Sequence, residues 1–113
     1  MTRNGIPPEG IELPTIEDFQ FNGMDGFIGW GLYGNGRLAV TMMSASKGGI
    51  QTLLKISVDV DEETPAVGCF FVKDWSENEG IMDALVEQGV VEDTGRRVPV
   101  GHTEAKEARL LIR

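Results

Sequence analysis

The sequence contains no second cysteine and no long apolar run, and each of these absences excludes a class of protein. Cys69 has no second thiol with which to form an intramolecular disulfide. No apolar stretch approaches the ~20 residues that a membrane-spanning helix needs, and residues 1–10 lack the apolar core of a signal peptide. We therefore expect a cytoplasmic protein with no membrane contact, whose fold rests on a hydrophobic core.

Basic residues are few and scattered along the chain. Ten Lys and Arg residues stand against 18 Asp and Glu residues, which gives a net charge of −8 at pH 7. Arg96 and Arg97 are the only adjacent cations, whereas binding to a phosphate backbone needs clustered Lys and Arg side chains. Direct binding of nucleic acid is therefore not expected.

The length of the chain and its prolines indicate how it is organised. A chain of 113 residues fits one domain and buries about two-thirds of its unfolded surface. Pro7, Pro8 and Pro14 fall near the start, and proline excludes a regular helix there. We predict an extended N-terminal arm over residues 1–14 and a single globular domain over residues 15–113.

The first clear element is a hairpin over residues 27–43. Asn35-Gly36 separates two apolar segments, and Asn-Gly is a strong hairpin signal. With Asn35-Gly36 as a two-residue loop, Gly31 lies opposite Val40 and Gly29 opposite Met42. Both faces of this hairpin are then largely apolar.

Two further segments have the patterns of strands. Residues 50–60 alternate between apolar and polar side chains, which predicts a long strand with a bend or bulge inside it. Residues 66–73 are almost continuously apolar and predict a central strand that is covered on both faces. Cys69 lies in this strand and is expected to be a core thiol.

Residues 77–88 have the pattern of a helix. Ser76 and Glu79 match a capping box at the start, and Gly89 stands where a left-handed terminating residue belongs. Residues 103–112 fit either a helix or a strand, and a strand is favoured because Gly101-His102 is typical of a turn.

These elements predict an α+β fold. We expect an antiparallel sheet of five to six strands, comprising the hairpin, the strand over residues 50–60, the central strand and C-terminal strands, with the helix packed on one face. A small, partly closed β-barrel with one helix is the alternative. One helix covers only one face, so we predict a homodimer that buries the second face through Ile28, Trp30 and Met43.

The motifs that resemble functional signatures do not predict a reaction. The string from Gly29 to Gly34 matches G-x-G-x-x-G, but it leads into another strand and not into a helix. The acidic turn after residue 58 lacks the ligand spacing of a calcium loop. No second titrating group accompanies His102, so no catalytic residue, metal site or cofactor is predicted.

Three functions are compatible with this sequence. The first is a small, acidic, non-catalytic binding protein that contacts a protein or a small molecule. The second is a ligand-binding domain or small enzyme with a trough over its paired glycines. The third is an acidic decoy of a nucleic-acid-binding protein, using successive carboxylates on the helix. The residues assigned to the trough and its rim are Phe27, Gly29, Gly31, Tyr33, Met42, Trp75 and His102, and those assigned to the acidic ridge are Glu79, Asp83 and Glu87.

Overall fold

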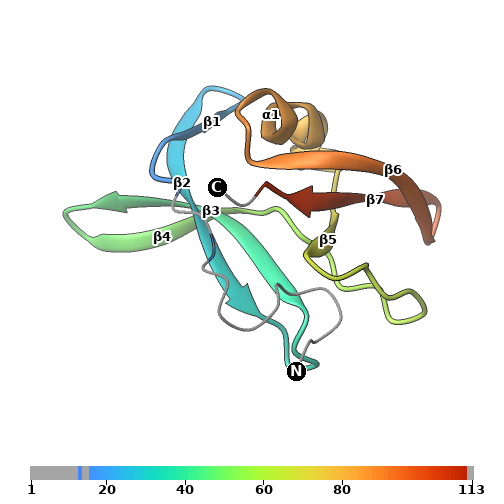
Figure 1. Ribbon diagram of the computed structural model, residues 1–113. Coiled ribbons are helices and arrows are strands. Elements are labelled where there is room, and N and C mark those ends of the chain that lie inside the picture. The colour runs from blue at the N-terminus through green and yellow to red at the C-terminus, as the bar shows by residue number, and fades with distance from the viewer. Residues whose placement is uncertain (1–12, 14–15, 112–113) are drawn as a thin grey trace.

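The computed structural model describes residue 13 and residues 16–111, and over this part the chain has an α+β fold with two antiparallel sheets (Figure 1). The first sheet has the strand order β1-β2-β3-β4 and the second has the order β5-β7-β6. The predicted α+β class is confirmed, but the strands form two open sheets where one sheet, or a partly closed barrel, was expected. The strands are β1 (Phe19–Phe21), β2 (Met24–Leu32), β3 (Leu38–Ser46), β4 (Gly49–Lys55), β5 (Cys69–Val72), β6 (Val91–Val100) and β7 (Thr103–Leu110).

The loop between β2 and β3 has three residues, so the predicted two-residue loop is wrong. The Tyr33 N–H donates to the Arg37 carbonyl at 2.8 Å, which leaves residues 34–36 as the loop. The Asn35 side-chain oxygen accepts the Arg37 N–H at 3.0 Å, and Gly36 has a φ of 85° that favours glycine.

The longer loop shifts the pairing of β2 with β3 by one residue. Trp30 lies opposite Val40, and Gly29 lies opposite Thr41. A shift of one residue moves each side chain of a strand to the other face relative to its partner. The face of Trp30 and Val40 turns to the core, while Gly29 shares the opposite face with Met43.

The predicted long strand over residues 50–60 divides between the two sheets. β4 ends at Lys55, and the N–H groups of Ile56 and Ser57 both donate to the Val40 carbonyl, at 2.9 and 3.1 Å. The Val58 N–H then donates to the Phe71 carbonyl at 2.9 Å, so the chain passes from β3 to β5 within three residues. The expected irregularity is present, both as this crossing and as a bulge in the pairing of β3 with β4.

The apolar segment predicted as a central strand forms β5, which lies at an edge of the second sheet. All four of its residues are buried. Phe70 and Val72 join the larger core cluster, whereas Phe71 joins a smaller one with Val60 and Val98. The strand is therefore covered on both faces, as predicted, although it is not central.

The helical region begins differently from the prediction and ends as predicted. The 3₁₀ turn η1 (Ser76–Asn78) precedes α1 (Ile81–Glu87), and no side chain of the proposed capping box caps either element. Instead the Asp74 carboxylate accepts the N–H groups of Gly80 and Met82, at 2.7 and 3.0 Å. At the other end Gly89 has a φ of 74°, which is the expected left-handed termination.

The remaining predictions concern the two ends of the chain. Residues 103–110 form β7, which confirms the strand over the helix. Residues 19–21, whose sequence fits either a helical turn or the start of a strand, form β1. Of the predicted N-terminal arm, only Leu13 belongs to the described residues, and it packs against the larger core cluster.

Candidate functional site

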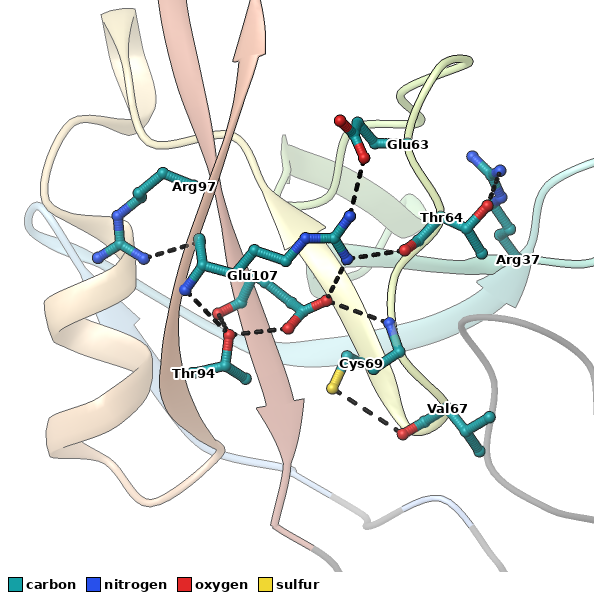
Figure 2. A network of polar contacts seen from close by, with 10 residues as sticks. Arg37, Glu63, Thr64, Val67, Cys69, Thr94, Arg97 and Glu107 are labelled. Carbon is teal, nitrogen blue, oxygen red and sulfur yellow. Dashed lines mark hydrogen bonds and ion pairs between the residues drawn. The ribbon is translucent and has the colours of Figure 1, made fainter.

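The most elaborate polar arrangement in the described residues surrounds the buried carboxylate of Glu107 (Figure 2). Glu107 is 4% exposed, and it accepts hydrogen bonds from the Ala66 N–H at 3.1 Å, the Thr94 hydroxyl at 2.8 Å and the Arg96 guanidinium at 3.0 Å. Burial raises the pKa of this carboxyl, but the hydrogen bonds and Arg96 outweigh burial and hold the pKa below its ordinary value. A carboxylate so fully engaged is a poor proton acceptor and serves the structure.

Two arginines extend this network across the loop of residues 59–68. Arg96 also binds the Glu63 carboxylate at 2.9 Å and the Thr64 carbonyl at 2.7 Å, and its guanidinium lies 5.2 Å from the centre of the Phe71 ring. Arg37 binds the Asp59 carboxylate at 3.1 Å and the Thr64 hydroxyl at 3.2 Å. The loop is thereby fixed to both sheets.

The single cysteine is a core thiol, as expected. Cys69 is 0% exposed, and its sulfur lies 3.9 Å from the Val67 carbonyl oxygen (Figure 2). Burial raises the pKa of the thiol, which disfavours the nucleophilic thiolate.

The structure distributes the residues of the predicted trough over separate places. Met42 is 0% exposed in the larger core cluster, on the face opposite Gly29 and Gly31. The position of a side chain on Gly29 is occupied by the Met43 sulfur, whereas no atom lies within 4 Å of that position on Gly31, so Met43 fills the trough at Gly29 only. Phe27 lies opposite Met43 on the face of Gly29 and Gly31, as predicted. The other assigned residues lie elsewhere: Tyr33 with its hydroxyl 2.8 Å from that of Ser57, Trp75 against the smaller cluster, and His102 exposed in the turn between β6 and β7.

The predicted interface and the predicted acidic ridge are also divided. Ile28 is 5% exposed in the core, and Trp30 packs against the same cluster, whereas Met43 faces the other way. Asp83 and Glu87 are exposed on α1, but Glu79 precedes the helix. Within the described residues, no group of three or more His, Cys, Asp or Glu side chains could hold a metal ion.

The hairpin of β3 and β4 contains an exposed surface that was not predicted from the sequence. We call residues 44–55 the ribbon, and it extends to one side, away from α1 and the second sheet (Figure 1). Residues 45–52 are all exposed, and Ile50 is 65% exposed. Cross-strand partners share a face, so Ile50, Thr52 and Lys55 lie on one face with Ala45, Met43 and Thr41. We call this the outer face.

The outward side of β4 has unpaired backbone groups. β4 is the last strand of the first sheet, and no strand of the described residues pairs with its far side. Hydrogen-bonded and non-hydrogen-bonded pairs alternate in an antiparallel ladder. The bonded pair of Tyr33 with Arg37 sets this alternation across β3, and it leaves Ile50 and Thr52 with their N–H and C=O groups directed away from β3.

Charge is distributed unevenly between the ribbon and the rest of the chain. No acidic residue lies between Asp25 and Asp59. Lys47 and Lys55 are exposed and make no ion pair within the part of the chain that the structure describes, whereas every other basic side chain there does. Those paired cations are Arg37, Lys73, Arg96, Arg97, Lys106 and Arg109.

Comparison with protein-family models, with curated proteins and with solved structures finds no match for this chain. Among the described residues, no helix combines the length and the apolar character needed to cross a membrane.

Proposed function

We propose that this protein is a non-catalytic interaction module whose contact surface is the ribbon. The observation that carries the proposal is Ile50, a large apolar side chain that is 65% exposed on a strand with an unpaired edge. Such an edge is a template for pairing with another chain, and exposed apolar patches mark contact surfaces. The unpaired thiol of Cys69 suits a reducing cytoplasmic location, which is part of this proposal.

The homodimer belongs to the same proposal, with a different surface from the one first expected. Ile28 and Trp30 turn toward the core, which leaves Met43 with Ala45 and Ile50 on the outer face. We propose that two copies pack through their outer faces and that the outward edge of β4 stays available to a partner.

The test compares Ile50→Asp with the matched variant Leu32→Asp. Leu32 is also an exposed apolar strand residue, at 55%, but it lies outside the ribbon. We expect sedimentation velocity to show a dimer for the wild type and for Leu32→Asp, and at least about ten-fold weaker association for Ile50→Asp, because each copy loses a buried apolar side chain.

The same two variants test for binding to other chains. A displayed library of random peptides is selected on immobilised wild-type protein, and the enriched peptides are then measured against each variant. We expect Ile50→Asp to lose them and Leu32→Asp to retain them. Equal behaviour of the two variants in both assays would contradict the proposal.

A further inference from the structure

The outward edge of β4 combines unpaired backbone groups with unpaired cations. Ile50 and Thr52 direct their N–H and C=O groups away from β3, and the Lys55 carbonyl farther along accepts the Asn78 side-chain N–H at 2.7 Å. The free part of the edge is therefore short, and it lies between Lys47 at the turn and Lys55. The stretch between these two lysines spans at most about 27 Å in an extended chain.

We propose that this edge binds an extended acidic segment of a protein partner, which adds to the first sheet as a strand beyond β4. The proposal rests on the interaction module proposed above and specifies the chemistry of its partner. In strand addition, main-chain hydrogen bonds provide affinity and alternate side chains provide specificity. On this edge, the free N–H and C=O groups of Ile50 and Thr52 would provide the affinity, and their side chains on the outer face would provide the specificity.

Charge complementarity favours an acidic segment. Lys47 and Lys55 are the exposed cations at the two ends of the free edge, and no carboxylate of the described residues neutralises them. Acidic side chains near both ends of an added strand meet these lysines. Apolar or β-branched residues at its centre lie beside Ile50 and Thr52, where such cross-strand pairs are favourable.

The same lysines disfavour a second copy of this chain on the edge. The antiparallel register that pairs all the outward groups sets Ile50 of each copy against Thr52 of the other. That register places Lys47 of one copy opposite Lys55 of the other, twice per pair. Like charges directly opposite are destabilising, and lysine on an edge strand is a known protection against self-pairing.

The experiment uses the full chain and three synthetic peptides, each about nine residues long to match the stretch between the lysines. All three share a core of alternating threonine and valine, and they carry glutamate, glutamine or lysine at both ends. Binding is followed by fluorescence anisotropy and by the backbone amide signals of the ¹⁵N-labelled protein. We expect the glutamate peptide to bind about five-fold more tightly than the glutamine peptide, as two exposed ion pairs would give. The signals of Ile50 and Thr52 should shift most.

Two sets of variants separate the contributions of charge and backbone. Reversing both lysines, Lys47→Glu with Lys55→Glu, should reverse the preference, so that the lysine peptide binds best. Thr52→Pro removes an outward N–H without removing a bond to β3, and it should weaken every peptide about ten-fold, while Thr52→Ala keeps the N–H and serves as its control.

Several outcomes would overturn the acidic strand. These are equal binding of the glutamate and glutamine peptides, largest shifts outside β4, or loss of the wild-type dimer in Thr52→Pro but not in Thr52→Ala, which would place a second copy on the edge. If no peptide binds while Ile50→Asp still abolishes association, the proposal of an acidic strand is wrong and the proposed interaction module is retained. If Ile50→Asp changes neither association nor peptide binding, the proposed interaction module is wrong as well.

Discussion

Substitutions of Glu107 test whether the buried network holds the loop of residues 59–68 on the two sheets. Glu107→Gln keeps the shape of the side chain and removes its charge. Its amide oxygen still accepts from Ala66 and Arg96, and the Thr94 hydroxyl can turn to accept from the new amino group. Glu107→Ala removes all three acceptor contacts and leaves buried donors unpaired.

The expected losses of stability follow from how deeply each partner of the ion pair between Glu107 and Arg96 is buried. Breaking a buried ion pair costs ~3–5 kcal/mol, but the Arg96 side chain is 36% exposed against 5% for Glu107, so water screens part of the attraction. We expect the free energy of unfolding to fall by about 1–2 kcal/mol in Glu107→Gln and by about 3–4 kcal/mol in Glu107→Ala. In urea unfolding followed by tryptophan fluorescence, the midpoints should fall by about 1 M and about 2 M.

The pH dependence of unfolding provides a second measurement. The pKa of Glu107 is lower in the folded protein than its ordinary value of 4.5. A carboxyl of this kind stabilises the fold above its unfolded pKa, and the contribution is lost as the pH falls through the folded pKa. The difference in the free energy of unfolding between wild type and Glu107→Gln should therefore have its full size at pH 7 and shrink below about pH 4.5. A Glu107→Gln variant as stable as the wild type at pH 7 would refute this reasoning.

Two further predictions concern local geometry. Asp74→Ala should lower the free energy of unfolding by about 1–2 kcal/mol and speed hydrogen exchange at the start of α1, because the Asp74 carboxylate accepts two backbone N–H groups there. Unchanged exchange would count against this cap. Among the alanine substitutions of the β2 glycines, Gly26→Ala should be the most destabilising, by about 3 kcal/mol. Gly29→Ala should follow with about 1 kcal/mol, and Gly31→Ala should be nearly neutral. A new Cβ meets the Met43 backbone at Gly26, the flexible Met43 side chain at Gly29 and no atom within 4 Å at Gly31, so thermal denaturation in a different order would contradict this account.

Local signals in the sequence located most elements but not their pairing. The Asn35-Gly36 dipeptide placed the hairpin correctly, yet the Asn35 side chain binds the Arg37 N–H and Gly36 takes a left-handed conformation, which extends the loop to three residues. Choosing between a two-residue and a three-residue loop depends on such contacts, and a one-residue error reverses every face. The predicted trough and interface both depended on that register.

The division into two sheets has no local signal. Residues 50–60 alternate as one strand, but Ile56 and Ser57 leave β4 to bond with Val40, and Val58 continues onto Phe71. The pattern of side chains is the same whether a strand continues in its sheet or crosses to another. Similarly, the spacing of Ser76 and Glu79 predicted a capping box, whereas the α1 cap comes from Asp74, which precedes both residues in the chain.

The fold gives no reason for an apolar side chain at the end of the ribbon. None of residues 44–52 belongs to either core cluster, whereas Leu54, just beyond them, is 8% exposed in the larger one. Substitutions of the non-glycine residues among 44–52 by residues other than proline should therefore leave the free energy of unfolding within about 0.5 kcal/mol of the wild type, since they remove no core contact. Gly49 is set apart because its φ of 109° favours glycine. An isoleucine on a free edge brings a hazard of aggregation that a polar residue would avoid at no expense to the core. Its presence there is explained if the ribbon is covered by another chain when the protein acts.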